Sequence, residues 1–304
     1  MTTAYVFPGQ GSQFPGMGRA FYEEWETTRK RFDALNAAVD VDLHDLCFDG
    51  ASDALRRTAN TQPAVFATGI ATHAGVCEHV GPPDYVAGHS LGHITAAAAA
   101  GALSDKAGID LVRRRGELMQ AAARANGPGT MVSVLLADPE TVVKVCGQYA
   151  DASVAGFNGP RNTAVSGRSE AVADVRADLD ARTRARFVDL DVSAAFHSPV
   201  MEPARDPFGD ALESAPLRPA TTPVCSDVTG ELYTDPAVAR RDLAAQLTAP
   251  IDWVSVVERL ADCGVTRYVA FPPAGTLSEL IDRIAPDAEI VRLEGPADVE
   301  EVTP

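Results

Sequence analysis

Lysine is the scarcest charged residue of this chain. Of 26 basic residues among 304, only Lys30, Lys106 and Lys144 are lysine, and 42 acidic residues bring the formal net charge to −16. A surface that binds nucleic acid needs a basic field, so this charge excludes that class of function. Hydrophobic residues at 46% and charged residues at 22% are typical of a folded globular chain and exclude a disordered one.

Long hydrophobic runs are also absent. The longest uncharged apolar stretch covers residues 94–103 and is mostly alanine, whereas a membrane-spanning helix needs roughly 20 such residues. The first residues, MTTAYVF, carry no basic segment ahead of apolar ones and do not form a signal peptide. We therefore expect a cytoplasmic protein that does not bind a membrane.

Cysteine is sparse and irregularly spaced. The five cysteines, an odd number with no CxxC pair, exclude a disulfide framework and indicate reduced thiols. His73, Cys77 and His79 are the nearest approach to a metal cluster, but their spacing is that of one helix end. We predict no metal site at these residues.

The chain does contain a regular alternation of strands and helices. We expect a strand over residues 3–7, helices over 21–38 and 64–79, a buried strand at 84–87 and a helix over 91–103. Such alternation predicts an α/β fold with a parallel sheet covered on both faces. The length of 304 residues suggests about two domains.

Residues 129–193 follow a different order. Strand, helix, two strands around a turn at 158–160, helix and strand succeed one another, which is the βαββαβ order of a ferredoxin-like unit. We predict that residues 128–193 form a small inserted subdomain. Residues 1–127 and 194–304 would then form the larger catalytic domain.

The pentapeptide Gly88-His89-Ser90-Leu91-Gly92 lies between the buried strand and the next helix. In that context a GxSxG pattern indicates a nucleophilic serine. The strained turn exposes the hydroxyl, and the helix N-terminus supplies amide donors and a positive dipole for an oxyanion. The alternative is a helix start with a capping serine, and we favour the nucleophile.

A nucleophilic serine needs a base. His197 lies just past the inserted unit, where a strand end gives way to a loop and a proline, as expected of a base at a pocket rim. A structural histidine remains the alternative at this position. Five other histidines have polar or helical surroundings or flank the serine on its turn: His44, His73, His79, His89 and His93.

The arginines at 113–115 differ in their helical neighbours. Arg113 and Arg114 have acidic residues three or four positions away, whereas all such neighbours of Arg115 are apolar. A guanidinium stays charged, and burying it unpaired is costly. Arg115 therefore meets a carboxylate either elsewhere in the fold or on a ligand, and its fork suits a substrate carboxylate.

The loop at residues 8–13 is rich in glycine. It has neither the lysine of a phosphate-binding loop nor the GxGxxG spacing, so a nucleotide fold is not supported. A backbone amide of this loop can instead be the second oxyanion donor, beside the amide that follows the nucleophile.

From residue 4 to about residue 293 the sequence resembles the malonyl-CoA:acyl carrier protein transacylases, the acyltransferases of fatty-acid and polyketide synthesis. The resemblance implies an α/β-hydrolase-like domain with an inserted ferredoxin-like subdomain, in agreement with the predicted organisation. Seven motifs in the family's order carry it: FPGQGSQ at 7–13, TQPA at 61–64, GHSLG at 88–92, RRRGELMQ at 113–120, FNGP at 157–160, AFHSPVM at 195–201 and QLTAPIDW at 246–253.

The resemblance implies roles for residues in these motifs. Ser90 resembles the nucleophile that becomes malonylated, and His197 the base that activates it. Arg115 resembles the partner of the free malonyl carboxylate. The main-chain carbonyl of Gln246 would orient the histidine in place of a triad aspartate, which gives a Ser-His dyad. Gln10 and Leu91 resemble the oxyanion-hole residues, which act through backbone amides.

Four further positions belong to the expected pocket. Phe196, just before the base, matches the phenylalanine of the AFH pattern in malonyl-selective members. The bulk of this side chain would leave little room for a 2-methyl group on the acyl chain. Leu91 also resembles malonyl-selective members. Gln62, His89 and Asn158 lie in the matching motifs and are expected to line the pocket.

The implied reaction is ping-pong and needs neither a metal nor a cofactor. Ser90 accepts malonyl from malonyl-CoA and passes it to the phosphopantetheine thiol of an acyl carrier protein. These two molecules are the expected partners, and we expect a monomer. The chain carries no ketosynthase or carrier segment, so we expect a discrete enzyme.

Other functions remain open at this point. A serine esterase would share GHSLG but would not explain FPGQGSQ or Arg115. A non-catalytic carrier-binding module would not need Ser90, His197 and Arg115 together. Within the family, a malonate decarboxylase transferase subunit and an acyltransferase serving a polyketide synthase in trans are both possible.

The acidic balance conflicts with the implied partners. Coenzyme A is anionic and carrier proteins of this kind are typically acidic, so a chain of charge −16 would repel both at low ionic strength. Either the arginines cluster near the cleft, or the enzyme works at high salt, where screening by ions shortens the range of the repulsion. Activity measured against salt concentration separates the two.

Overall fold

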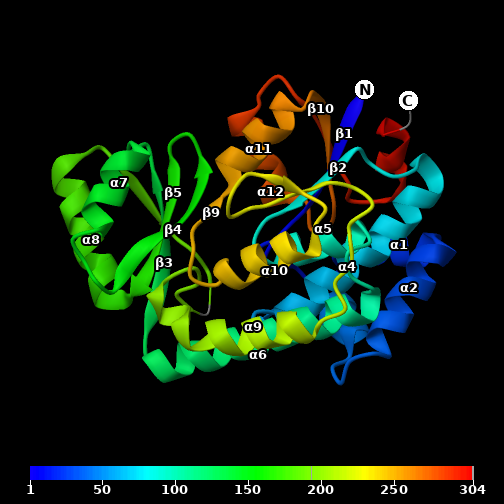
Figure 1. Cartoon of the computed structure of the whole chain (residues 1–304), viewed down its shortest axis with the longest axis horizontal. Coiled ribbons are helices and arrows are strands. Elements are labelled where there is room, and N and C mark those ends of the chain that lie inside the picture. Colours follow the sequence, from blue (N-terminus) through cyan, green and yellow to red (C-terminus); the bar gives the residue numbers. More distant parts are fainter. Residues whose placement is uncertain (193, 303–304) are drawn as a thin grey trace.

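The computed structural model describes residues 1–192 and 194–302, which form two sheets with their covering helices (Figure 1). Residue 193, at the predicted domain boundary, and the last two residues of the expected 194–304 segment lie outside the described residues. The alternation of strands and helices around a parallel sheet confirms the expected α/β fold.

The first sheet has six strands in the order β11-β10-β1-β2-β7-β8. All neighbours pair in parallel except β8, which pairs antiparallel with β7 at the edge. The carboxyl ends of β1, β2 and β7 therefore meet at one edge, where open parallel sheets bind ligands. The strands are β1 (Thr2–Phe7), β2 (Tyr85–Gly88), β7 (Val224–Cys225), β8 (Leu232–Tyr233), β10 (Val265–Ala270) and β11 (Glu289–Arg292).

Both faces of this sheet are covered. Along β1, Tyr5 and Phe7 pack into one hydrophobic cluster with α4 and α5, and Ala4 and Val6 pack into another with α11 and α12. This division follows from the two-residue period of a strand. The helices of this part are α4 (Thr58–Val80), α5 (Leu91–Ala99), α6 (Asp105–Asn126), α9 (Glu202–Ser214), α10 (Pro236–Ala245), α11 (Trp253–Asp262) and α12 (Gly275–Ile284).

Two helix predictions need correction. The helix expected over residues 21–38 is two helices, because Trp25 takes an extended conformation and its indole stacks on His79 at 4.2 Å between ring centroids. The helix expected from residue 64 begins at Thr58, since buried packing of its first turns outweighs the propensity of Pro63 to end a helix. The remaining helices are the α-helices α1 (Arg19–Glu24), α2 (Glu26–Asn36) and α3 (Ser52–Leu55), the π-helix η1 (Asp45–Asp49), and the 3₁₀ helices η2 (Pro199–Met201) and η3 (Pro296–Glu301).

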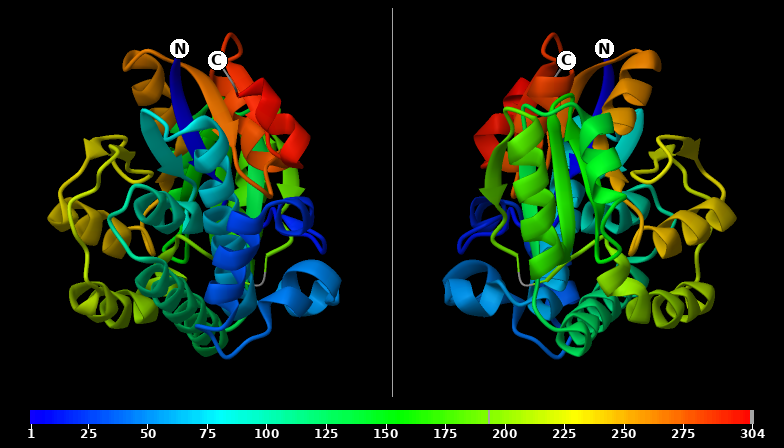
Figure 2. Two further views of the ribbon diagram at one scale, coloured as in Figure 1. Left: turned by 90° about the vertical axis from the view of Figure 1, so that its right-hand side faces the viewer. Right: turned by 90° about the vertical axis from the view of Figure 1, so that its left-hand side faces the viewer.

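The second sheet has the strand order β6-β3-β5-β4-β9. Its first four strands pair antiparallel, and α7 and α8 pack on the face turned away from the rest of the molecule (Figures 1 and 2). The opposite face of this sheet therefore lies toward the first sheet. The elements are β3 (Gly129–Leu135), α7 (Pro139–Cys146), β4 (Ala152–Gly159), β5 (Asn162–Arg168), α8 (Ser169–Arg182) and β6 (Arg186–Asp189).

A fifth strand, β9 (Ile251–Asp252), extends this sheet from outside the predicted 128–193 segment. It pairs in parallel with β4 at Gly156, and Ile251 is fully buried. The sequence analysis missed this strand because two residues carry no periodic signal. The two parts of the chain are consequently joined by backbone hydrogen bonds as well as by side chains.

Candidate active site

Ser90 lies on a sharp turn between β2 and α5. Its backbone has φ 55° and ψ −109°, a conformation that side-chain-bearing residues rarely adopt. A Cβ at Gly88 would overlap the carbonyl oxygen of Gly92, and a Cβ at Gly92 would overlap that of Phe7. The two glycines of the GxSxG pattern are therefore required for the turn to form against β1.

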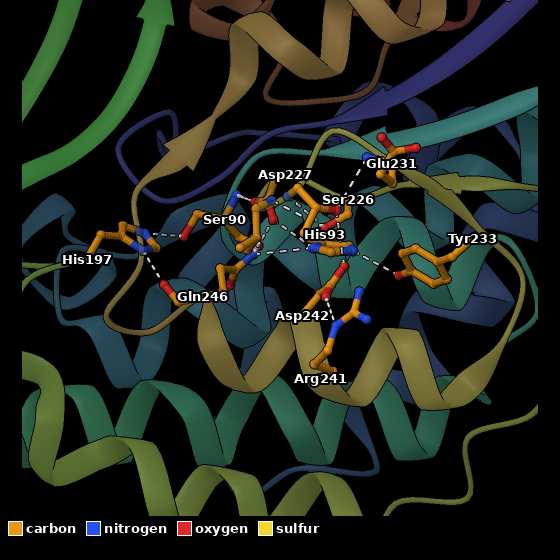
Figure 3. Close-up of polar contacts among 12 residues, drawn as sticks. Ser90, His93, His197, Ser226, Asp227, Glu231, Tyr233, Arg241, Asp242 and Gln246 are labelled. Atoms are coloured by element: carbon orange, nitrogen blue, oxygen red, sulfur yellow. Dashed lines mark hydrogen bonds and ion pairs between the residues drawn. The ribbon is translucent and has the colours of Figure 1, made fainter. Parts of the chain in front are cut away.

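Ser90 and His197 face each other across the site. The Ser90 Oγ lies 2.8 Å from His197 Nε2, and His197 Nδ1 lies 2.7 Å from the backbone carbonyl oxygen of Gln246 (Figure 3). A carbonyl can only accept, so Nδ1 carries the hydrogen and Nε2 is left to accept the serine proton. A backbone carbonyl thus occupies the position that a carboxylate has in a hydrolase triad.

The environment of His197 favours the neutral imidazole. Burial, and after it the nearby Arg115 cation, lower the pKa of His197 to about 4. The ring is therefore unprotonated at neutral pH and available as a base. The lowered pKa also makes the protonated ring a stronger acid than an ordinary imidazolium, which favours release of that proton.

Arg115 points into the same site from α6. Its side chain is 1% exposed, and its Nη2 lies 2.9 Å from Gln246 Oε1 and 3.2 Å from Ser90 Oγ. Burial lowers the pKa of Arg115 to about 10, which leaves it charged at neutral pH. Among the described residues, its Nε has no hydrogen-bond acceptor and no carboxylate lies within 4.0 Å of its guanidinium. Of the two alternatives left by the sequence, an acidic partner within the fold is not found in this part of the chain.

A cavity of about 310 Å³ opens in front of Ser90 between the two sheets. Its apolar wall comes from both parts of the chain, with Phe196, 5% exposed, next to the base. The lining residues are Gly9, Gln10, Gly11, Ser12, His89, Ser90, Arg115, Met119, Met131, Ala155, Gly156, Asn158, Ala164, Leu190, Asp191, Val192, Phe196, His197, Ile251, Thr276, Leu277 and Leu280.

Three of the expected site residues lie just outside this lining. Gln62 is fully buried, and its Nε2 lies 3.2 Å from the sulfur of Met119, which lines the cavity. Leu91 is the first residue of α5, so its amide has no acceptor within the helix. Gln246 reaches the site through its carbonyl and side chain, as described above.

His89 and Asn158 connect the two parts of the chain at the cavity wall. His89 Nε2 lies 3.0 Å from Asn158 Oδ1 on β4. Burial lowers the pKa of His89, which favours the neutral ring. Gly9 packs directly against this residue, since a Cβ there would lie 2.6 Å from the His89 carbonyl oxygen. The contact fixes the loop after β1 against the serine turn.

A buried polar group behind Ser90 was not predicted from the sequence. Asp227 follows β7 and is fully buried; its Oδ2 accepts the backbone N–H of Ser90 at 2.6 Å and its Oδ1 lies 2.7 Å from His93 Nδ1 (Figure 3). A polar residue at the carboxyl end of a parallel strand was the available signal for Asp227. His93, which flanks Ser90 on its turn, faces Asp227.

His73, Cys77 and His79, the nearest approach to a metal cluster in the sequence, do not point toward one common position. Cys77 lies 3.2 Å from His73, whereas His79 bonds the carbonyl of Gly75 and stacks on Trp25. Within residues 1–192 and 194–302, no group of three or more histidine, cysteine or acidic side chains is arranged to hold a metal ion. No helix in the same residues is long and apolar enough to cross a membrane. The absence of a cofactor stays a prediction.

Comparison with known proteins gives consistent matches over the whole chain. The acyl transferase domain family matches residues 4–289. The malonyl CoA-acyl carrier protein transacylase of Bacillus subtilis is 33% identical over 302 residues, which cover 98% of this chain and 95% of that protein. The crystal structure of the malonyl-CoA:acyl carrier protein transacylase of Xanthomonas oryzae superposes with a TM-score of 0.94 at 36% identity, covering 99% and 98% of the two chains.

A third match includes a partner. A malonyl transacylase solved in complex with the holo acyl carrier protein of a type II polyketide synthase has a TM-score of 0.94 and 30% identity, covering 99% of this chain and 98% of that one.

Proposed function

The chain belongs to the acyl transferase domain family, and from this premise we propose that it transfers a malonyl group from malonyl-CoA, through an ester on Ser90, to the phosphopantetheine thiol of an acyl carrier protein. Relatives with this activity cover nearly the full chain, and one was solved with its carrier protein. Ser90 is the nucleophile and His197 the base of a Ser-His dyad.

Arg115 is the observation that carries the choice of substrate. It is a buried cation that opens on the cavity, beside the Ser90 hydroxyl, and among the described residues its Nε has no acceptor and its guanidinium has no carboxylate in direct contact. A free carboxylate on the acyl group would satisfy both. An uncharged acyl group would leave them unsatisfied, so a simple esterase gains nothing from this residue.

The first half of the reaction loads the enzyme. His197 Nε2 takes the Ser90 proton as Oγ attacks the thioester carbonyl, and the tetrahedral oxyanion forms near the N-terminus of α5. Backbone amides of Leu91 and Gln10 are the proposed oxyanion donors. The carbon–sulfur bond then breaks, and the imidazolium returns the proton to the leaving thiolate of coenzyme A.

The second half reverses these steps with a different thiol. The phosphopantetheine thiol gives its proton to His197 as its sulfur attacks the malonyl ester. The Ser90 oxygen leaves and recovers the proton from the imidazolium. The low pKa of His197 suits both halves, because the ring must accept and release a proton in each.

We also propose the domain architecture, the acyl selectivity, the cellular location and the oligomeric state of the enzyme. The second sheet forms a ferredoxin-like subdomain over residues 128–193, supported by its antiparallel strand order, and the first sheet forms an α/β-hydrolase-like catalytic domain. Phe196 limits the acyl pocket to malonyl. The enzyme acts in the cytoplasm, which fits the five free cysteines, and we expect it to act as a monomer.

Incubation with labelled malonyl-CoA tests the function directly. We expect a malonyl ester on Ser90, located by peptide mass spectrometry, and its transfer to holo carrier proteins added afterwards. Candidate carriers from fatty-acid and polyketide synthesis, offered in competition, identify the partner. Absence of any acyl-enzyme on Ser90 would contradict the proposal.

A further inference from the structure

We propose that Asp227 is a positioning residue of the acyl-transfer site, whose carboxylate fixes both the backbone of Ser90 and the side-chain amide of Gln246 and thereby aims Arg115 at the acyl carboxylate. This inference rests on the proposed function. It assigns a role to a buried acid that lies outside the cavity lining.

The carboxylate holds the strained serine turn from behind. Asp227 Oδ2 accepts the Ser90 N–H at 2.6 Å, and the Ser90 carbonyl oxygen accepts from Gln246 Nε2 at 3.0 Å. Both polar groups of the Ser90 backbone are therefore bound on the side away from the cavity. A residue with φ 55° persists only where its surroundings fix it, and these bonds do so without using the hydroxyl.

The same carboxylate sets which way the Gln246 amide faces. Gln246 Nε2 lies 2.8 Å from each oxygen of Asp227. A carboxylate only accepts, so the amide must turn its NH₂ toward Asp227 and its oxygen away. That oxygen, Oε1, then accepts from Arg115 Nη2 at 2.9 Å. Asp227 thus reaches Arg115 through a single side chain whose orientation it determines.

The remaining partner of Asp227 keeps it ionised. Oδ1 accepts from His93 Nδ1 at 2.7 Å, and His93 Nε2 lies 2.8 Å from the Tyr233 hydroxyl. Burial raises the pKa of Tyr233 well above its usual value, so the phenol keeps its proton and donates to His93. Burial alone would raise the pKa of Asp227, but the bonds from His93 and Gln246 lower it overall.

The variant Asp227→Asn separates positioning from simple packing. An asparagine fills the same volume but offers one acceptor, and its NH₂ opposes that of Gln246. Because Gln246 Nε2 also donates to the Ser90 carbonyl oxygen, the amide cannot satisfy both neighbours, and its oxygen is no longer held firmly toward Arg115. We expect single-turnover acylation of Ser90 by malonyl-CoA to fall about 100-fold and acylation by acetyl-CoA only about tenfold. The malonyl-to-acetyl ratio, which a general loss of packing would not change, is the diagnostic quantity.

Asp242→Asn is the matched control. Asp242 is also a buried acid, 1% exposed, and it bonds Arg241 Nε at 2.8 Å on α10 close to the same group (Figure 3). Its side chain has no bond to Ser90 or Gln246 among the described contacts. We expect both acylation rates of Asp242→Asn to stay within about twofold of the wild type.

The outcomes separate this inference from the proposed function. If wild-type enzyme forms no malonyl ester on Ser90, the function fails whatever Asp227 does. If wild type is acylated and Asp227→Asn keeps the wild-type malonyl-to-acetyl ratio, the positioning role is overturned.

A second variant covers the case in which Asp227→Asn does not fold, as judged by thermal unfolding. His93→Gln leaves the carboxylate in place and changes one of its donors. We expect a two- to threefold fall in the same ratio, on the order of one weakened hydrogen bond. An unchanged ratio in a folded His93→Gln enzyme would also overturn the role.

Discussion

Ser90 separates two sides of the site that differ in how their charges are satisfied. On the pocket side, Arg115 is buried with an unpaired Nε and without a carboxylate partner in the described chain. On the rear side, the carboxylate of Asp227 accepts from Ser90, His93 and Gln246. The Arg115 and Asp227 side chains are both almost completely buried, so burial alone does not distinguish a charge that binds a ligand from a structural one.

The difference indicates where a ligand belongs. Burying a charge is costly unless partners replace its water, so a stable fold completes the shell of a structural charge. An incomplete shell beside an open cavity is tolerated where a ligand completes it. This contrast is the reason for our proposals that Asp227, on the rear side, positions the site and that Arg115, on the pocket side, binds the acyl carboxylate.

The strongest way to break this comparison is Ser90→Ala. It removes only the hydroxyl on the pocket side, and the Ser90 backbone bonds on the rear side remain. We expect malonyl transfer to fall by roughly 10⁴-fold or more, with a thermal midpoint within about 2 °C of wild type. Transfer to a carrier protein and calorimetry measure the two. A large loss of stability would mean that the two sides are not separable at this residue.

Arg115→Ala tests the incomplete charge. We expect acylation by malonyl-CoA to fall roughly 10²- to 10³-fold, because the acyl carboxylate loses its partner in a buried site, and acylation by acetyl-CoA to change by less than about tenfold. Arg114→Ala, one residue earlier and half exposed, is the control and should change neither rate. Equal losses on both substrates would make Arg115 a structural residue.

The pH dependence of kcat/KM sharpens the comparison further. Because burial and Arg115 lower the pKa of His197 to about 4, the base is neutral above that pH. Activity should be level from about pH 5.5 to 7 and fall about tenfold per pH unit below 4. In Arg115→Ala, followed with acetyl-CoA, the fall should begin at a higher pH, since the cation that lowers the pKa is gone. A wild-type fall centred near the ordinary histidine value would contradict this.

The smallest expected effect concerns the pocket wall. In wild type, malonyl-CoA should outcompete methylmalonyl-CoA for Ser90. Phe196→Ala should raise the methylmalonyl-to-malonyl ratio about tenfold, in the range of one methyl group in a tight pocket. Phe14→Ala, a phenylalanine 52% exposed and not among the described lining residues of the cavity, is the control. If malonyl-CoA and methylmalonyl-CoA acylated the wild-type enzyme equally well, Phe196 would not be the residue that excludes the 2-methyl group.

Much of this arrangement could be predicted from local patterns. GxSxG between a strand and a helix located Ser90, and the apolar helical neighbours of Arg115 identified a charge whose partner lies beyond its own helix, either elsewhere in the fold or on a ligand. The same local reasoning failed at Trp25, which ends a helix because of a contact with His79 from a different helix. It also failed at β9, whose two residues pair with β4 from nearly a hundred positions away.

The sequence by itself determined the nucleophile chemistry available at Ser90, because the glycine-bounded turn and the helix N-terminus follow from residues next to one another in the chain. Only the tertiary structure decided how that chemistry is aimed. Asp227 meets Ser90 across 137 positions and acts through hydrogen bonds that have direction and a short range. Such bonds depend on the packing of β2 against β7, which no local pattern in the chain records.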